Sequence, residues 1–467
     1  MTGVEDGGAA RVVRAERLPD GTPDVPVAIV GAGACGLTAA LMLRDAGVDC
    51  ALLERDARSQ GSTALSSGFI PAAGTRVQRA AGVNDDSAQR FARDIQAKAR
   101  GTAAAHLVAA YTAAIAPAID ALQQRHGLGF ELLDGFLYPG HGVRRMHTLP
   151  QRTGAALVAA LESAALRAGT TQVGHARVTQ LWCDGGDRVL GVGYRRPDGA
   201  LEHLGCRVLL LASNGFGGNA AMVRELLPEM REAVFAGHAG NDGSAIAWGR
   251  QLGARLADLG GYQGHGSWAI PQGALITWAL MTQGGIQVNS AGRRFHDETA
   301  GYSEAAVQVL AQPGAIAWNV FDARLLALGR EFPDFVAAEA AGALRDAGDV
   351  RGLAALIGCQ PETLSPTLAG SRLEAPYSAV KVTGALFHTQ GGLDIDADGR
   401  VLHEAGGPFA NLLAAGGAAR GVSGNAVWGY LSGNGLLSAV AGGFIAARTA
   451  ARQLGGRGAR SPGRGFR

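Results

Sequence analysis

The pattern of apolar and polar positions is clearest between residues 25 and 54. An apolar run at 27–30 predicts a short buried strand, the helical spacing of apolar residues at 37–46 predicts a helix, and a second apolar run at 48–53 predicts another strand. The second strand ends at an acidic residue, Glu54. Strand, helix and strand in this order predict a βαβ unit that belongs to a parallel sheet.

The turn inside this unit has the spacing G-x-G-x-x-G, in the sequence Gly31-Ala-Gly-Ala-Cys-Gly36. The first glycine suits a tight turn, Gly33 lets the backbone approach a pyrophosphate, and Gly36 lets helix and strand pack closely. The amide groups at the helix N-terminus bind phosphate, and Glu54 is placed to accept hydrogen bonds from a ribose. The alternative is a glycine-rich turn without a ligand, and the complete βαβ order favours nucleotide binding.

Further patterns predict how the chain is divided. Helices are expected at 78–126 and 153–168, and strands at 172–181, 189–195 and 206–212. Residues 237–372 mix helices with short strands, and the glycine-rich strand–turn–helix pattern returns afterwards. We therefore predict an α/β fold in which a Rossmann-like nucleotide-binding domain is interrupted by an inserted α+β domain. The expected boundaries are a flexible N-terminus at 1–24, the nucleotide-binding domain at 25–236 and 373–454, the inserted domain at 237–372 and a flexible tail at 455–467.

Composition narrows the class of protein. With 47% hydrophobic and 18% charged residues in 467, the chain predicts a large folded core and excludes disorder. The net charge is only +2 and the arginines are scattered, which argues against a nucleic-acid partner. Five widely spaced cysteines without C-x-x-C predict neither disulfides nor a metal site and favour a reducing cytoplasm. We read no secretory signal and no apolar run of about 18 residues, so no integral membrane segment is expected.

Two further segments point to FAD among the nucleotides. Residues 60–68 supply hydroxyls where the phosphate and ring edge of a flavin would lie, and residues 413–419 form a strand that enters a glycine turn. Residues 429–438 open the last helix, whose N-terminus could face the electron-rich edge of a reduced flavin. The alternative is that these segments are turns and helix caps without a ligand. Three such segments in this order favour FAD binding over that alternative.

The chain resembles the fumarate reductase/succinate dehydrogenase flavoprotein family. The resemblance covers about residues 25–451 and rests on these motifs: Gly31–Gly36, Gly215–Asn219, Gly237–Gly243 followed by Gly253-Ala254, Gly285–Asn289, Gly292–Phe295 with Glu298, His388–Gly392 and Gly416-Gly417. It implies an FAD-binding domain, an inserted domain that caps a small-molecule substrate, and hydride transfer between flavin N5 and a carbon next to an activated one. Covalent members carry a histidine where this chain has Ser62, so non-covalent FAD is expected.

Carried over residue by residue, the resemblance predicts the FAD-binding positions. They are Gly31, Ala32, Gly33, Ala34, Cys35, Gly36, Glu54, Arg55, Ser62, Thr63, Ser67, Gly68, Val178, Ala212, Ser213, Asn214, Asn241, Asp242, Gly417, Asn434, Gly435, Leu436 and Leu437.

Two tyrosines depart from the fumarate reductase pattern. Tyr302 stands where those enzymes have a proton-donating arginine, and Tyr430 stands where they have an arginine that holds the substrate. Arginine suits a dicarboxylate, whereas a tyrosine can donate to a neutral carbonyl or act as a base. This pair resembles the 3-ketosteroid Δ1-dehydrogenases. By that likeness Tyr430, with the N–H of Asn434 or a neighbour, stabilises an enolate and Tyr302 removes the α-proton. Packing is the alternative for each, and Tyr138 is either a proton relay or a packing residue.

The remaining candidates concern the substrate. His388 matches a histidine that grips a substrate carboxylate, which favours α,β-desaturation of a small cyclic keto acid such as 4-oxocyclohexanecarboxylate. The alternatives are a fumarate-reductase-like reductase of a conjugated acid, a 3-ketosteroid dehydrogenase, and a non-catalytic FAD-binding or sensor protein. Electrons would leave to oxygen, a quinone or a dye-like carrier. Whether the polar loop with Arg144, Arg145 and His147 takes part is open, as is a pocket role for three residues of the inserted domain, Gln263, His265 and Trp268.

Overall fold

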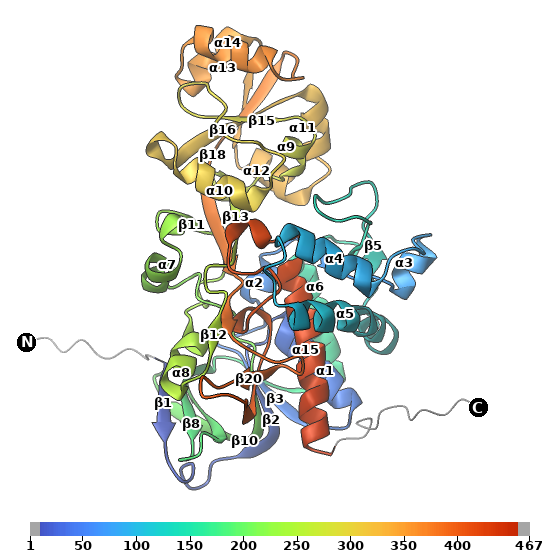
Figure 1. The fold of residues 1–467 in the computed structure, drawn as a ribbon, viewed down its shortest axis with the longest axis vertical. Coiled ribbons are helices and arrows are strands. Elements are labelled where there is room, and N and C mark those ends of the chain that lie inside the picture. Colours follow the sequence, from blue (N-terminus) through green and yellow to red (C-terminus); the bar gives the residue numbers. More distant parts are fainter. Residues whose placement is uncertain (1–9, 456–467) are drawn as a thin grey trace, which may run out of the picture. The chain divides into compact units, whose positions relative to one another are not determined.

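The computed structural model describes residues 10–455, and these form two units (Figure 1). Unit 1 contains the residues up to Asn219, Gly237–Gly261 and the residues from His388 onward. Unit 2 contains Ala220–Ala236 and Tyr262–Phe387. Each unit has a hydrophobic core of its own. The predicted α/β fold with an inserted α+β domain is therefore confirmed.

Unit 1 is built on a nine-stranded sheet. Its main path runs β1-β8-β9-β10-β2-β3-β7, with β21 paired to β10 and β20 paired to β21. The strands are β1 (Arg11–Arg14), β2 (Asp24–Val30), β3 (Cys50–Leu53), β7 (Thr171–Val173), β8 (Arg177–Cys183), β9 (Val189–Arg195), β10 (Leu201–Leu211), β20 (Arg400–Leu402) and β21 (Pro408–Ala414). The pairs β2–β3, β2–β10 and β10–β21 are parallel. The apolar residues Val27–Val30 are buried, as expected for a central parallel strand.

Parallel pairing sets the ends of four strands side by side. Val30 lies opposite both Leu53 and Leu211, and Leu211 lies opposite Ala414. The loops that follow β2, β3, β10 and β21 therefore leave the sheet at one edge. Ligands of open α/β sheets bind outside this carboxyl edge.

Helices of unit 1 pack on the sheet and on each other. Helix α1 (Ala34–Asp45) contacts α15 (Asn434–Gln453) and α6 (Gly154–Arg167), and α15 also contacts α5 (Ala105–His126). A Cβ atom at Gly443 would overlap the carbonyl oxygen of Cys35, so glycine is needed where α1 meets α15. The shorter elements are α2 (Gly61–Ala64), α3 (Arg76–Ala80), α4 (Ala88–Lys98), α8 (Ser244–Leu252), β12 (Leu256–Ala257) and β19 (Gly392–Leu393), with a small sheet of β4 (Ile70–Pro71), β6 (Met146–Thr148) and β5 (Glu131–Leu132).

Helix α5 corrects one expectation. By length and composition it is apolar enough to cross a membrane, so the chain does contain such a stretch. Half of its most apolar window is buried inside the protein, and α5 packs against α4 and α15. These contacts assign α5 to the core of unit 1.

Unit 2 is an α+β structure on a seven-stranded sheet. The path is β14-β13-β18-β16-β15, with β11 and β17 also paired to β18. The strands are β11 (Val234–Phe235), β13 (Tyr262–Ala269), β14 (Ala274–Leu275), β15 (Ile286–Val288), β16 (Ile316–Asp322), β17 (Leu344–Ala347) and β18 (Tyr377–Thr389). The helices are α7 (Ala220–Leu226), α9 (Ala279–Thr282), α10 (Tyr302–Leu310), α11 (Ala323–Gly329), α12 (Pro333–Ala340), α13 (Val350–Ile357) and α14 (Pro361–Ala369).

The unit boundaries differ from the expected ones. Residues 237–261 fall in unit 1 because α8 packs against β1 and β19 of that unit. Residues 373–387 fall in unit 2 because β18 is the strand to which β16 and β17 pair. The N-terminal segment from residue 11 is also structured, since β1 pairs in parallel with β8. Residues 1–9 and 456–467 of the two expected flexible ends lie outside the described residues.

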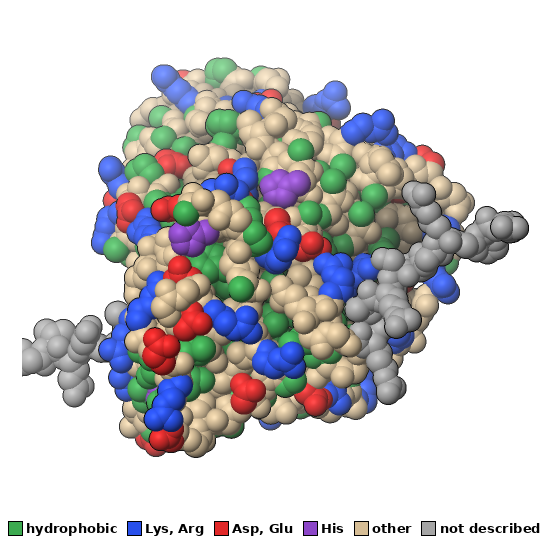
Figure 2. Space-filling view, turned by 60° about the horizontal axis from the view of Figure 1, so that its bottom comes forward, with side chains coloured by type: hydrophobic (Ala, Val, Ile, Leu, Met, Phe, Trp, Pro, Cys, Tyr) green, Lys and Arg blue, Asp and Glu red, His purple; other side chains and the backbone are tan. Residues whose placement is uncertain are grey.

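Charges are mixed on the surface. On the face drawn in Figure 2, basic and acidic side chains are interspersed rather than gathered by sign. This agrees with a net charge of only +2.

Candidate active site

The turn between β2 and α1 has the geometry that its glycines predict. Gly31 has φ +103°, and a Cβ atom there would lie 2.6 Å from the carbonyl oxygen of Ala212. A Cβ atom at Gly36 would overlap the carbonyl oxygen of Gly31. Gly33 caps α1, so the first amide groups of the helix are bordered by a residue without a side chain. The turn can therefore bring backbone N–H groups against a phosphate.

Glu54 lies at the end of β3 beside this turn. Its two carboxylate oxygens accept hydrogen bonds from the backbone N–H groups of Ala32 (2.9 Å) and Asp56 (3.0 Å). Burial raises the pKa of Glu54, and these two N–H groups oppose the rise. A carboxylate fixed in this way at a strand end retains lone pairs for the hydroxyls of a ribose. This is the place that the sequence predicts for Glu54.

The segment after β3 contacts both the start of α1 and residues 241–242. Thr63 Oγ1 accepts a hydrogen bond from the N–H of Ala34 (3.1 Å) at the start of α1. Ser62 Oγ accepts one from Asn241 Nδ2 (2.8 Å), and Arg55 lies 3.7 Å from Asp242. Ser67 and Gly68 follow on the same loop, where a Cβ atom at Gly68 would lie 2.7 Å from the carbonyl oxygen of Thr153.

The loop after β10 closes the other side of the turn. The N–H of Ala212 donates to the carbonyl of Val30 (2.9 Å), and Asn214 has φ +66°. A Cβ atom at Gly417 would overlap Asn214 Oδ1. Ser213 Oγ is buried and has no hydrogen-bond partner among the described residues. Val178 lies apart from this group in the sequence, buried in β8 opposite Tyr194, and its contact with a cofactor stays a prediction.

The start of α15 also combines a glycine turn with buried polar atoms that lack a partner among the described residues. Gly433 caps the helix with φ +88°, and a Cβ atom there would lie 2.6 Å from Pro71 Cδ. Asn434 and Leu437 are buried, while Leu436 is partly exposed. Within the described part of the chain, Asn434 Oδ1 and Ser438 Oγ are buried without a partner.

These features fit FAD. Glycine turns that a Cβ atom would block, a carboxylate held at a strand end, and orphaned polar atoms at Ser213, Asn434 and Ser438 suit a bound diphosphate, ribose and ring. Cys35 is not a reactive thiol in this setting, since burial raises its pKa to about 12.

His388 and Tyr430 come together at the start of α15. Their ring centroids are 5.5 Å apart, and a Cβ atom at Gly435 would lie 2.7 Å from His388 Nε2 and 3.6 Å from Tyr430 Oη. Both side chains therefore face the position of Gly435. The sequence alone predicts each residue but not their meeting point.

Both groups are neutral at pH 7. Burial lowers the pKa of His388 to about 4, opposed by the carbonyl of Thr389. Burial raises the pKa of Tyr430 well above its usual range, opposed by the backbone amides of Gly435 and Gly433. The site can therefore offer two uncharged donors to a substrate oxygen.

Sequence reasoning missed two of the three residues behind His388, Gln390 and Ser423, whereas Asn434 was predicted as an FAD-binding position. Gln390 Nε2 donates to His388 Nδ1 (3.0 Å), Ser423 Oγ donates to Gln390 Oε1 (2.8 Å), and Asn434 Nδ2 donates to Ser423 Oγ (3.0 Å). The motif His388-Thr-Gln-Gly-Gly392 contains Gln390, and the available signal was a polar side chain among glycines beside the predicted histidine.

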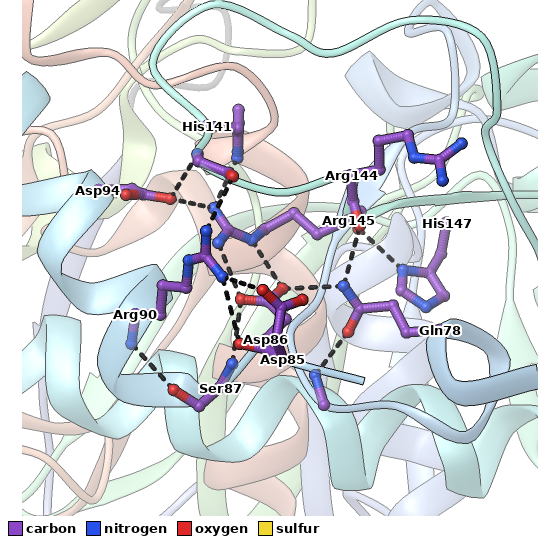
Figure 3. A network of polar contacts seen from close by, with 12 residues as sticks. Gln78, Asp85, Asp86, Ser87, Arg90, Asp94, His141, Arg144, Arg145 and His147 are labelled. Carbon is purple, nitrogen blue, oxygen red and sulfur yellow. Dashed lines mark hydrogen bonds and ion pairs between the residues drawn. The ribbon is translucent and has the colours of Figure 1, made fainter. Parts of the chain in front are cut away.

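The polar loop around Arg145 is a structural network (Figure 3). The Arg145 side chain is fully buried and pairs with Asp86 (2.9 Å) and Asp94 (2.5 Å). It also donates to His141 Nδ1 (3.1 Å), and His141 Nε2 contacts the carbonyl oxygen of Ser432 (2.9 Å) just before α15. Arg145 thus ties its loop to the turn that leads into α15, and its charge is already paired.

The neighbours of Arg145 also make contacts within the protein. Arg144 pairs with Asp134 at the surface, and His147 is buried between Thr75 (2.7 Å) and the carbonyl of Arg145 (2.9 Å). Tyr138 contacts the rings of Phe69 and Phe136 at centroid distances of 6.1 and 4.9 Å. The packing alternative for Tyr138 therefore has contacts to support it, and its relay role stays a prediction.

In unit 2, Tyr302 is the first residue of α10 and belongs to an aromatic stack. Its ring is stacked on His265 (4.9 Å between centroids, 19° between planes), and His265 is stacked on Phe387 (5.5 Å, 15°). Trp268 meets Phe387 edge-on at 5.8 Å. Burial lowers the pKa of His265 to about 3, so this ring is neutral. Among the three candidates of the inserted domain, His265 and Trp268 thus share a cluster with Tyr302.

Comparisons with known proteins agree with this site. The family described as "FAD binding domain" matches residues 26–436. The probable fumarate reductase Ifc3 of Shewanella frigidimarina is 27% identical, over 91% of this chain and 74% of its own length. The 4-oxocyclohexanecarboxylate 2-dehydrogenase of Sinomonas cyclohexanicum is 24% identical, over 93% of this chain and 95% of its own length.

Solved structures show the same fold. The open conformation of a flavocytochrome c3 fumarate reductase has a TM-score of 0.80 and 26% identity, over 93% of this chain and 79% of that one. A 3-ketosteroid Δ4-(5α)-dehydrogenase from Rhodococcus jostii RHA1 has a TM-score of 0.74 and 24% identity, over 94% of this chain and 100% of that one.

The predicted resemblance is confirmed, and with it a small-molecule substrate and electron exchange through FAD. The family covers most of the described chain and includes the glycine turns, Glu54 and the start of α15. The chain therefore belongs to the FAD-binding flavoprotein family of fumarate reductases and succinate dehydrogenases, and it is an FAD-dependent oxidoreductase that acts on CH–CH groups.

Proposed function

We propose that the enzyme oxidises a ketone to its α,β-unsaturated form. The observation that carries the proposal is the pair of neutral donors, His388 Nε2 and Tyr430 O–H, which face the same point beside Gly435. A ketone oxygen is a neutral acceptor that becomes negative as the α-proton leaves. Preorganised donors at that oxygen lower the barrier to enolate formation. A dicarboxylate is instead recognised by the fixed charge and fork of an arginine.

Each residue has a separate role in this reaction. When bound, FAD supplies the acceptor for the hydride that leaves the β-carbon. Tyr430 holds its proton, since burial raises its pKa, and donates a hydrogen bond to the ketone oxygen. We assign removal of the α-proton to Tyr302, which stands at the first position of α10. The carbon–carbon double bond forms as the α-proton and β-hydride depart.

We propose a small cyclic keto acid as the substrate class. A small cyclic keto acid, such as 4-oxocyclohexanecarboxylate, combines a ketone with an apolar ring. The similarity to a 4-oxocyclohexanecarboxylate 2-dehydrogenase over 95% of that enzyme supports this class.

A second candidate is the reverse reaction on a conjugated carboxylic acid. The similarity to fumarate reductases favours it more strongly than it favours ketone oxidation. The neutral state of His388 and Tyr430 is the observation against it. When the activating group is itself a carboxylate, a fixed positive charge is needed there, whereas a ketone oxygen needs only neutral donors. Both candidate reactions use FAD. They differ in the group that activates the carbon chain, which is a ketone in the first reaction and a carboxylic acid in the second.

We also propose that FAD is held without a covalent bond. Ser62 stands at the attachment position of the covalent members, and its hydroxyl accepts a hydrogen bond from Asn241. A serine at this position has no ring nitrogen to link to the flavin. The electron acceptor that follows is proposed to be oxygen, a quinone or a dye-like carrier.

The test compares ketones and acids on one sample. Oxidised enzyme is mixed without oxygen with cyclic keto acids, their esters and succinate, and flavin absorbance is followed. Dye-reduced enzyme is then mixed with fumarate. The proposal expects bleaching by a keto acid that exceeds every rate with succinate or fumarate. Faster reoxidation by fumarate would instead establish the second candidate.

A further inference from the structure

Three hydrogen bonds form a chain that ends on His388. Asn434 Nδ2 donates to Ser423 Oγ (3.0 Å), Ser423 Oγ donates to Gln390 Oε1 (2.8 Å), and Gln390 Nε2 contacts His388 Nδ1 (3.0 Å). Asn434 and Ser423 are fully buried and Gln390 nearly so. All four residues belong to unit 1.

The chain has a direction. Because Ser423 Oγ accepts a hydrogen bond from Asn434 Nδ2, its own hydrogen is free to point at Gln390 Oε1. The amide oxygen of Gln390 is thereby fixed towards Ser423, so its NH₂ group must face His388. An amide NH₂ can only donate, and His388 Nδ1 must therefore accept. The single proton of a neutral imidazole is left on Nε2.

We propose that Gln390 is a positioning residue that, held by Ser423 and Asn434, keeps His388 in the Nε2–H form, so that a substrate oxygen meets two neutral donors. The nature of that oxygen rests on the proposed function, whereas the state of His388 does not. The other tautomer would turn a nitrogen lone pair towards the position of Gly435 and repel a substrate oxygen.

The surroundings of His388 support a neutral ring with one defined tautomer. Among the described residues no charged side chain shifts the pKa of His388, since burial lowers it and the Thr389 carbonyl opposes. The titratable side chain against its ring is Tyr430, whose pKa burial raises. The Thr389 carbonyl, 3.3 Å from Nδ1, is the competing acceptor that would select the opposite tautomer. The bond from Gln390 is the shorter of the two.

The direct test is nuclear magnetic resonance of the FAD-bound enzyme labelled with ¹⁵N-histidine. The His388 signals are assigned by their loss in His388→Gln. The proposal expects a protonated Nε2 and an unprotonated Nδ1 in the wild type, unchanged between pH 5.5 and pH 8. A proton on Nδ1 in the wild type would overturn it. This measurement needs no substrate, so its outcome does not depend on the proposed function.

The variant Gln390→Glu should reverse the arrangement. A carboxylate accepts from Nδ1–H, so His388 should show a protonated Nδ1 and a new titration in the same pH range. Ketone-driven flavin reduction should fall about 10²-fold, as when an oxyanion donor is lost, and should become pH-dependent. Unchanged His388 signals would overturn the proposal. Gln453→Glu at the exposed end of α15 adds the same charge and should leave signals and rate unchanged.

A second variant of Gln390 guards against a folding failure of Gln390→Glu. Gln390→Met keeps the length of the side chain and removes the donor. Nδ1 is then expected to carry a proton that bonds to the Thr389 carbonyl in a measurable fraction of molecules. If Nε2 stays fully protonated without Gln390, the glutamine does not set the tautomer and the proposal fails.

Discussion

At the scale of single residues, three histidines of unit 1, the buried His141 and His147 and the partly exposed His388, show how hydrogen-bond partners decide chemistry. Burial lowers the pKa values of His141, His147 and His388 to about 4, so all three are neutral at pH 7. Arg145 can only donate to His141 Nδ1, whereas His147 Nδ1 faces a carbonyl that can only accept. His141 and His388 therefore hold the proton on Nε2, and His147 holds it on Nδ1.

The first prediction concerns acid stability. The pKa values of His141 and His147 are lower in the folded protein than the usual 6.5, so the unfolded chain binds more protons below that pH. Their stabilising contribution is complete above about pH 6.5 and is lost as the pH falls towards 4, by up to about 3 kcal/mol for each. Chemical denaturation should therefore give a lower free energy of unfolding at pH 5 than at pH 7.5.

The control for this prediction is a pair of histidine variants. His147→Gln should reduce the dependence of stability on pH, because the buried group is gone. His175→Asn, at an exposed position, should leave the dependence unchanged. Equal pH dependence in the wild type and both variants would show that the buried histidines do not govern acid stability.

The second prediction concerns Tyr430. Tyr430→Phe keeps the ring and removes the donor from the substrate oxygen, so folding and FAD content should be preserved. Flavin reduction by a ketone should slow by about 10²- to 10³-fold, the scale of losing one oxyanion donor. Rapid-mixing absorbance measures this rate. A rate within threefold of the wild type would assign Tyr430 to packing.

At the scale of elements, local chemistry predicts some features and not others. The turn from Gly31 to Gly36 and the place of Glu54 follow from spacing, because backbone geometry there admits few residue types. Strand β1, with only four residues, has no pattern of its own and exists through its pairing with β8. The bond from Gln390 to His388 depends on Ser423, more than thirty residues further on, which a linear pattern cannot reveal.

The third prediction tests the β2–α1 turn. A Cβ atom at Gly36 would overlap the carbonyl oxygen of Gly31 and lie 3.2 Å from Ile29 Cγ2. Since backbone cannot yield as a side chain does, Gly36→Ala should cost about 1–3 kcal/mol and abolish FAD retention on gel filtration. The matched control is Gly129→Ala, where nothing lies within 4 Å of the new Cβ atom. FAD retained at wild-type level in Gly36→Ala would contradict the fit of the turn.

At the scale of the whole molecule, the fold does not choose the substrate. A fumarate reductase and a 3-ketosteroid dehydrogenase share this fold with TM-scores of 0.80 and 0.74. Substrate choice therefore lies in a few side chains placed on a common frame. The boundaries of the two units were harder to predict than the fold. Strand β18 belongs to unit 2 because it pairs with β16, and its composition does not indicate this.

The fourth prediction concerns how the whole protein holds FAD. If Ser62 stands at the attachment position of the covalent members, as we propose, acid or heat precipitation should release all of the yellow colour into the supernatant as FAD. Absorbance of supernatant and pellet measures the partition. Colour that stays with the washed pellet would show a covalent link.

The measurement that tests the central claim most directly is anaerobic flavin reduction by a ketone set against reoxidation by fumarate, with wild-type enzyme and Tyr430→Phe in parallel. Two neutral donors at one point predict that a cyclic keto acid bleaches the wild-type flavin faster than succinate, that fumarate reoxidises it poorly, and that Tyr430→Phe loses the ketone reaction. Fast reoxidation by fumarate, with no bleaching by any ketone, would contradict the account.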